Sequence, residues 1–201
     1  MATTKTLNSK DFRWDGYYWT AEIQLLCWRG FQRRRGSYGT KSSPAASDGT
    51  VTIVFAPEGR DDAALSATEI DLVRWTIEHA EAMQAAMLAK LVTYYAAQRP
   101  RYAEFLDEEY AQLMPEVTDA GGFKELIRLR SLNVHPLSKR GVPYVGLEFA
   151  CTWDNEHGLG ALMHGERVVE LGGADTAILL WIAKRDAKKK KVKNPKKRQR
   201  G

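Results

Sequence analysis

A short connection in the C-terminal half of the sequence gathers side chains that can do chemistry. Between Trp153 and Gly160 the chain reads Trp-Asp-Asn-Glu-His-Gly-Leu-Gly. Carboxylates and an imidazole are ligands for divalent metals, and the imidazole is also a candidate general base. Strand patterns flank the segment on both sides, so it must be a loop, where functional residues concentrate. The candidate binding loop consists of Trp153, Asp154, Glu156, His157, Gly158 and Gly160.

Three interpretations of this loop stay open. A divalent-metal site would use Asp154, Glu156 and His157, but three ligands within four residues rarely converge on one ion without a further ligand. His135 or His164 could supply that ligand. A structural turn needs only an acid or amide that accepts backbone hydrogen bonds, glycines at positive φ and a buried tryptophan. The third interpretation is a loop that binds a partner. No motif implies a cofactor, and no catalytic residue is assigned.

The second chemical feature is a run of basic residues. From Lys184 to Gly201, eleven basic residues and one acid give a charge of +10, against +5 for the whole chain, so residues 1–183 carry −5. Like charges without apolar partners predict a disordered tail at 184–201. Such a tail binds polyanions, including nucleic acid, without reading their sequence. The predicted contacts are Lys188, Lys189, Lys190, Lys191, Lys193, Lys196, Lys197, Arg198 and Arg200.

Other partners fit the same charge distribution. The tail could meet ribosomal RNA or an anionic membrane surface, or it could keep the protein in solution without a dedicated ligand. In a eukaryotic source the same residues would be read as a nuclear import signal. The acidic remainder of the chain could bind a protein partner through the surface around Asp154 and Glu156.

The elements that must position these residues can be read from hydrophobic periodicity. Alternating apolar residues predict strands before and after a helical region. A two-residue turn at Asp15-Gly16 predicts an N-terminal hairpin, and a change of phase near Ser131 predicts a β-bulge. The predicted strands are 17–27, 51–55, 126–134, 144–153, 159–164 and 167–171.

The middle of the chain predicts one long amphipathic helix over 66–98. Ser66 and Glu69 have the spacing of a capping box, apolar residues recur every three or four positions, and Pro100 ends the pattern. A shorter helical stretch follows at 101–113.

These elements predict an α+β fold. It consists of an antiparallel sheet with the long helix inserted between N-terminal and C-terminal strands. We expect a single domain over 1–183, with a flexible loop at 29–49, followed by the disordered basic tail. Residues 174–185 could be helix or strand, and their Ala, Lys and Arg content favours helix.

Compartment is indicated by what the sequence lacks. No apolar run is long enough for a secretory signal or a membrane span. Cys27 and Cys151 continue the apolar phase of their segments, which predicts buried free thiols. We therefore expect a cytoplasmic protein, or a nuclear one if the source is eukaryotic.

The C-terminal strand region resembles a known family. A strand that ends in Trp-Asp-x-Glu-His-Gly-Leu-Gly, followed by a short hairpin and the end Gly-Gly-Ala-Asp175, is similar to a mainly bacterial domain of unknown function. The resemblance covers residues 120–177 and leaves out the long helix and the tail. It implies a bacterial cytoplasmic protein, and similar domains occur among immunity and accessory proteins of bacterial toxin systems. It implies no catalytic roles.

The functional prediction is a non-enzymatic binding protein whose basic tail gives sequence-independent affinity for nucleic acid. One alternative is a protein-interaction module of the toxin-immunity type. The second is a divalent-metal-dependent hydrolase centred on the loop from Trp153 to Gly160.

Overall fold

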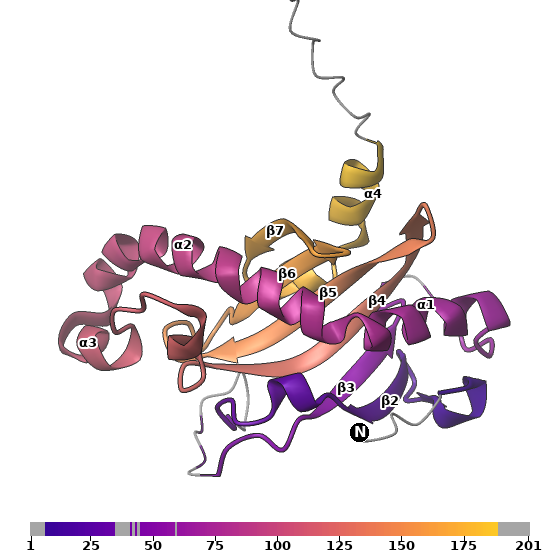
Figure 1. The fold of residues 1–201 in the computed structure, drawn as a ribbon, viewed down its shortest axis with the longest axis horizontal. Helices are drawn as coiled ribbons and strands as arrows, with labels where there is room; N and C mark the ends of the chain where they lie inside the picture. The colour runs from indigo at the N-terminus through magenta and orange to yellow at the C-terminus, as the bar shows by residue number, and fades with distance from the viewer. Residues whose placement is uncertain (1–6, 35–40, 42, 44, 59, 189–201) are drawn as a thin grey trace, which may run out of the picture.

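The computed structural model describes residues 7–34, 41, 43, 45–58 and 60–188 (Figure 1). Its centre is one seven-stranded sheet. The strands are β1 (Arg13–Trp14), β2 (Trp19–Gln24), β3 (Thr50–Phe55), β4 (Ile127–Lys139), β5 (Val142–Cys151), β6 (Leu159–His164) and β7 (Arg167–Gly172). They are neighbours in chain order, and all pairs are antiparallel except β3 and β4. That parallel pair needs a long connection, which the helical region supplies. The predicted α+β fold with an inserted helix is confirmed.

Helices cover the sheet unequally. The α-helices are α1 (Ala67–Glu78), α2 (Ala80–Leu106), α3 (Tyr110–Leu113) and α4 (Leu180–Lys188). The 3₁₀ segments are η1 (Ser9–Asp11), η2 (Leu26–Trp28), η4 (Asp107–Glu109), η5 (Ala120–Phe123) and η6 (Ala174–Ala177). Figure 1 shows α1 and α2 lying end to end across one face of the sheet. Among the described residues, no helix is both long and apolar enough to cross a membrane.

Strand β5 is buried on both faces. Val145, Leu147 and Phe149 join the main core with residues of α1 and α2. On the opposite face, Tyr144 packs in a smaller cluster with Ile182 of α4. Alternation along β5 therefore places its side chains on two faces. The second face is buried as well, because the segment η6–α4 covers it here.

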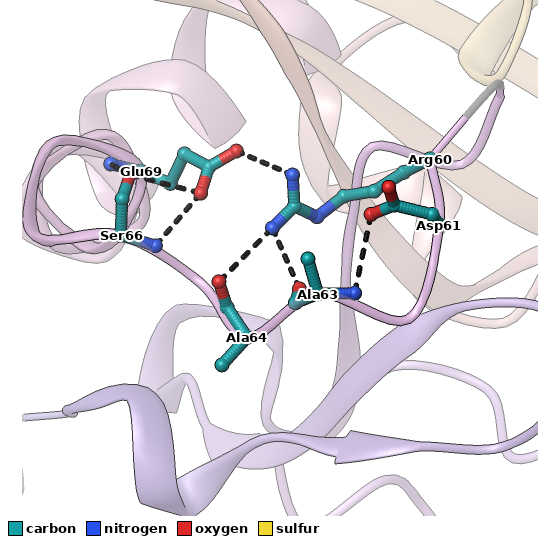
Figure 2. Close-up of polar contacts among 6 residues, drawn as sticks. All are labelled: Arg60, Asp61, Ala63, Ala64, Ser66 and Glu69. Carbon is teal, nitrogen blue, oxygen red and sulfur yellow. Dashed lines mark hydrogen bonds and ion pairs between the residues drawn. The ribbon is translucent and has the colours of Figure 1, made fainter.

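The capping box predicted at the start of the helical region is present. The Ser66 hydroxyl accepts from the Glu69 N–H at 3.4 Å, and the Glu69 carboxylate accepts from the Ser66 N–H at 2.8 Å. Figure 2 shows that Arg60 reaches the same carboxylate, with an amino group 2.7 Å from Oε1, and donates to the carbonyls of Ala63 and Ala64. The start of α1 is thus tied to the preceding loop by charge-assisted hydrogen bonds.

The predicted single helix over 66–98 is wrong in both its continuity and its end. It is broken at His79, whose N–H and ring Nδ1–H both donate to the Trp75 carbonyl, at 3.1 and 2.7 Å. The imidazole also stacks on the Trp75 ring, with centroids 3.9 Å apart. The second helix continues through Pro100 to Leu106. Proline leaves the carbonyl of Ala96 without its helical donor, but Ala96 is exposed, so water can bond it.

The N-terminal hairpin has a longer turn than the one predicted. Trp14 pairs with Trp19, so four residues connect the strands instead of two. The Asp15 carboxylate accepts from the N–H groups of Tyr17 and Tyr18, at 2.9 and 2.7 Å. An aspartate that bonds the backbone two and three residues ahead stabilises the wider turn.

The predicted flexible loop at 29–49 is anchored at both ends. Gly30 donates to the Ser47 carbonyl at 2.8 Å, and Ser47 donates to the Phe31 carbonyl at 2.7 Å. Phe31 is buried and lies against Trp28, with ring centroids 4.9 Å apart. The residues between these anchors at 35–40, 42 and 44 lie outside the described residues.

The boundary between the domain and the tail lies further along the chain than predicted. Residues 174–185 are helical rather than extended, as preferred, but in two pieces: η6 ends at Ala177, and α4 begins at Leu180 and runs to Lys188. Asp186 is buried in α4, where its carboxylate accepts from the Tyr144 hydroxyl at 2.9 Å and from Arg167 at 2.5 and 3.2 Å. Residues 189–201 lie outside the described residues, so the predicted disorder of the tail stays a prediction.

The predicted free thiols are present. Cys151 is buried, Cys27 is half-buried, and neither forms a disulfide. Burial raises the pKa of Cys151 to about 12 and that of Cys27 to about 11, so both are thiols at neutral pH.

His135 makes the stability of this fold depend on pH. Its Nε2–H donates to the Ala177 carbonyl at 3.0 Å, and no described residue bonds Nδ1. Burial lowers its pKa from the usual 6.5, outweighing the Ala177 hydrogen bond and the charge of Glu58. The unfolded chain therefore binds this proton more tightly than the folded one. The free energy of unfolding should therefore be independent of His135 titration above pH 6.5 and should decrease as the pH falls below 6.5.

Urea denaturation between pH 7.5 and pH 5 measures this effect. The variant His135→Gln, which cannot gain the proton, should lose part of the dependence. The exposed His157→Gln should keep it. Equal pH dependence in His135→Gln and the parent protein would contradict the assignment.

Candidate functional site

The candidate binding loop is a turn organised by Asp154. Its Oδ1 accepts from the His157 N–H at 2.8 Å, and its carbonyl accepts from the Gly158 N–H at 3.0 Å. Gly158 has a φ of +61°, and a Cβ there would lie 2.7 Å from the Phe149 carbonyl oxygen. Trp153 is buried edge-on against Tyr95, with ring centroids 4.9 Å apart. These contacts match the interpretation of the loop as a structural turn.

Two long-range hydrogen bonds tie this turn to distant segments. Tyr102 of α2 donates its hydroxyl proton to Asp154 Oδ2 at 2.7 Å. Burial raises the Tyr102 pKa and the bond to Asp154 adds to it, so the phenol stays a donor. On the other side, the Arg34 guanidinium donates to Asn155 Oδ1 at 3.2 Å. The loop therefore joins α2 to the segment around residue 34.

The chemical capacity of the loop is limited by this geometry. His157 Nδ1 lies 3.2 Å from Asp154 Oδ1, and the imidazole side chain is 73% exposed. An imidazole oriented by a carboxylate corresponds to two members of a catalytic triad, the base and the group that orients it. The third member, a nucleophile, is also required. Within the described ranges, no three His, Cys, Asp or Glu side chains are gathered so that they could hold a metal ion. Glu156 is exposed and does not join the pair.

Gly160 has a packing role in strand β6. A Cβ on this residue would overlap the carbonyl oxygen of Gly173 and lie 2.9 Å from that of Ala174. The two glycines of the candidate loop thus shape the backbone and let η6 approach the sheet.

A second site, which the sequence did not predict, lies on the sheet face opposite α1 and α2. We name it the open-face pocket. It is a cavity of about 610 Å³, and its walls come from strands β2 to β5, the N-terminal hairpin, the segment at residue 34 and Ile178. Its chemical character comes mainly from Val54, Arg128, Arg130, Ser131, Asn133 and Glu148.

The predicted β-bulge is confirmed and helps to build this pocket. Leu129 pairs with Phe149 and Ser131 pairs with Glu148, so Arg130 is the extra residue. Leu129 and Leu132 remain in the core. The residues that alternate with the core positions, together with the inserted Arg130, line the opposite, polar face.

The floor of the pocket is a connected polar network. The Asn133 side-chain amide donates to Ser131 Oγ at 3.0 Å, and the Ser131 hydroxyl donates to Glu148 Oε2 at 2.8 Å. Arg130 lies 3.4 Å from Glu148 Oε1. Asn133 and Ser131 are only 2% and 7% exposed. Hydrogen bonds in such a chain hold each side chain in one orientation.

The predicted polyanion contacts are represented in the structure by Lys188 alone. It is exposed at the end of α4, on a helix that also exposes Lys184 and Arg185. The Arg185 guanidinium lies 4.8 Å from the ring centroid of Trp181, which is 51% exposed, and it also pairs with Glu170. The other eight predicted contacts, from Lys189 to Arg200, lie outside the described residues.

Comparison with known proteins identifies a family for most of the chain. A family model described as a domain of unknown function (DUF6985) matches residues 30–179. This range includes α1 and α2, which the resemblance at 120–177 left out. No curated protein and no solved structure matches the chain significantly.

Proposed function

The chain belongs to the DUF6985 family, a domain of unknown function. We propose that this member is a non-enzymatic binding protein with sequence-independent affinity for nucleic acid. The observation that carries this proposal is the placement of charge. Eight basic residues and no acid follow Lys188, and they begin at a helix that is docked on the sheet through Asp186.

The side chains that α4 exposes beside the tail support the proposal. A flexible polycation gains affinity by releasing the counterions of nucleic acid, whatever its base sequence. Lys184 and Lys188 on α4 add positive charge next to the point where the tail starts. Trp181 on the same helix is 51% exposed and carries the Arg185 guanidinium over its ring, so a base could stack only on the part of the ring that Arg185 leaves open. Free thiols fit a reducing compartment such as the bacterial cytoplasm, which is part of the same proposal.

The salt dependence of binding tests this function. In a full-length variant with glutamine in place of the eight basic residues between Lys189 and Arg200, affinity for single-stranded RNA and DNA should fall sharply. With about 0.7 counterions released per neutralised phosphate, the plot of log affinity against log salt for the parent protein should have a slope on the order of −5. The variant should lose most of this slope. Fluorescence anisotropy with labelled oligonucleotides measures both quantities.

The control removes tail residues without touching the fold. A chain ending at Lys188 retains Asp186 and should unfold like the full-length protein, whereas a chain ending at residue 183 would cut through α4. Equal affinity and slope in the parent and the glutamine variant would overturn the proposal. If neither of these two proteins binds RNA or DNA, the proposal is also wrong, and the toxin-immunity type of protein interaction becomes the function to test.

That alternative would use different residues from the ones predicted. Glu156 is exposed, but the side chain of Asp154 is only 15% exposed and is occupied by internal hydrogen bonds. A protein partner would therefore meet Glu156 and His157 and not a pair of acids. The metal-dependent alternative has no three-ligand group in the described part of the chain.

A further inference from the structure

The open-face pocket has the size and position of a ligand site. Its volume of about 610 Å³ is within the range of pockets that hold small molecules, roughly 300 to 1,000 Å³. It lies where η6 and α4 stop covering the second face of the sheet, because Ile178, between these two elements, forms one wall. The pocket is therefore bounded by rigid strands and by a segment docked on them.

The polar floor is too ordered for an ordinary exposed sheet face. One continuous chain of contacts runs from Asn133 through Ser131 and Glu148 to Arg130. Asn133 and Ser131 are almost completely buried. Burying such groups costs free energy unless they are paired. A network that is already paired presents its remaining donors to a ligand without rearrangement, which reduces the entropy lost on binding.

The charge of the pocket favours an anion. Three arginines line it, Arg34, Arg128 and Arg130, against two acids, Asp15 and Glu148. Arg128 donates to the carbonyl of Arg34, so these two segments are held together at one end of the cavity. Guanidinium groups remain charged at every accessible pH and bind carboxylates and phosphates with good geometry.

Part of the remaining wall is apolar, beside polar side chains such as Thr20 and Thr52. Val54, Pro57 and Ile178 line the cavity beside the polar floor. A ligand that fills the pocket therefore needs an anionic group and an apolar body. The residues that would meet the anionic group and the apolar body come from strands and segments that are distant in sequence.

We propose that the open-face pocket binds a small organic anion, whose carboxylate or phosphate contacts Arg130 and Arg128 while its apolar part packs on Val54 and Ile178. Ser131 and Asn133 would act indirectly, because their hydrogen bonds hold the Glu148 carboxylate that pairs with Arg130. The site is independent of the basic tail, because every residue that lines it precedes residue 179.

Titration of the full-length, isotope-labelled protein tests the site. The probes are phenyl phosphate and benzoate, which distinguish a phosphate from a carboxylate ligand, with benzyl alcohol as the uncharged control and inorganic phosphate as the anion without an apolar part. At least one aromatic anion should cause saturable amide shifts in β3 and β4, with a dissociation constant of about 1 mM or lower. Benzyl alcohol should cause none there.

Substitutions identify the residue responsible. Arg130→Gln should weaken binding of the preferred probe about tenfold, which corresponds to about 1.4 kcal/mol. Arg140→Gln is the matched control, because Arg140 is an exposed arginine of the β4–β5 turn that does not line the pocket. If Arg130→Gln unfolds, Arg130→Lys keeps the charge and should weaken binding severalfold through loss of the planar guanidinium.

Two results would overturn the inference. One is the absence of saturable shifts in β3 and β4 with both aromatic anions at about ten times the expected dissociation constant. The other is equal weakening by the Arg130 and Arg140 substitutions, which would indicate attraction to net charge alone. Neither result bears on nucleic-acid binding by the tail, which is measured separately with the glutamine variant.

Discussion

Replacing Gly146 with alanine should lower the free energy of unfolding by about 3 kcal/mol, the upper part of the usual range for overpacking a core. A Cβ on Gly146 would overlap the Ala177 carbonyl oxygen and lie 2.5 Å from its carbon and 2.7 Å from its Cα. All three are backbone atoms, so no side chain can rotate away. The same carbonyl is held by His135, which opposes a local shift.

The substitution therefore has only costly outcomes. Either η6 moves away from β5 and α4 moves with it, or β5 itself distorts. Urea denaturation should show a lower midpoint. Amide hydrogen exchange should accelerate most in η6 and α4. The control is Gly141→Asn, because Gly141 has nothing within 4 Å of its hypothetical Cβ and asparagine tolerates its φ of +77°. A loss for Gly146→Ala as small as that for the control would contradict the close approach of η6.

The second large effect is expected at Asp186. Asp186→Ala should cost about 2 kcal/mol, less than for a fully buried ion pair, because Arg167 remains half exposed. The Tyr144 hydroxyl would lose its acceptor inside the smaller core cluster. Since α4 is held by this carboxylate and by Ile182 and Ala183, its docking should weaken before the sheet unfolds.

Hydrogen exchange of α4 amides and urea denaturation measure the two parts of this effect. The double substitution with Tyr144→Phe should cost less than the sum of the single ones, because both remove the same hydrogen bond. Asp175→Asn, an exposed acid in η6, is the matched control. Additive costs for Asp186→Ala and Tyr144→Phe would contradict the contact.

Asp186 also gives this docking a pH dependence in a lower range than that of His135. Burial alone would raise its pKa, but hydrogen bonds from Arg167 and Tyr144 outweigh burial and lower it below 3.8. Its contribution to stability is therefore complete above pH 3.8 and is lost as the pH falls below that value. The His135 contribution starts to fall already near pH 6.5. Two residues that hold η6–α4 to the sheet thus respond to acid in separate ranges.

Local signals in the sequence predicted local structure well. The capping box at Ser66 and the bulge before Ser131 are both present, because each depends on residues a few positions apart. The helix break at His79 was missed, since it is accompanied by an imidazole that stacks on Trp75 and adds a second donor to the Trp75 carbonyl, which no local sequence pattern signals. The helix end at Pro100 was wrong, since the tolerance of proline depends on whether the carbonyl one turn earlier is exposed.

The candidate loop brings together residues that are close in sequence and one that is not. Asp154 and His157 do lie together, but Asp154 is bound by Tyr102, which comes from a helix 52 residues earlier in the chain. The open-face pocket left two signals on one strand, the alternation of Arg128 and Arg130 with apolar residues and the change of phase near Ser131. That alternation is also typical of any solvated sheet face, so it could not indicate a cavity.

By itself, the sequence determined the order of strands and helices, the apolar faces and the separation of a basic tail from an acidic remainder. These properties follow from periodicity and composition, which each segment carries on its own. Only the tertiary structure decided that β3 and β4 pair in parallel, that η6 and α4 cover part of the second sheet face, and that an uncovered part forms a pocket. The physical reason is that a period of two residues assigns a side chain to a face, whereas the element that covers that face is chosen by contacts between residues far apart in the chain.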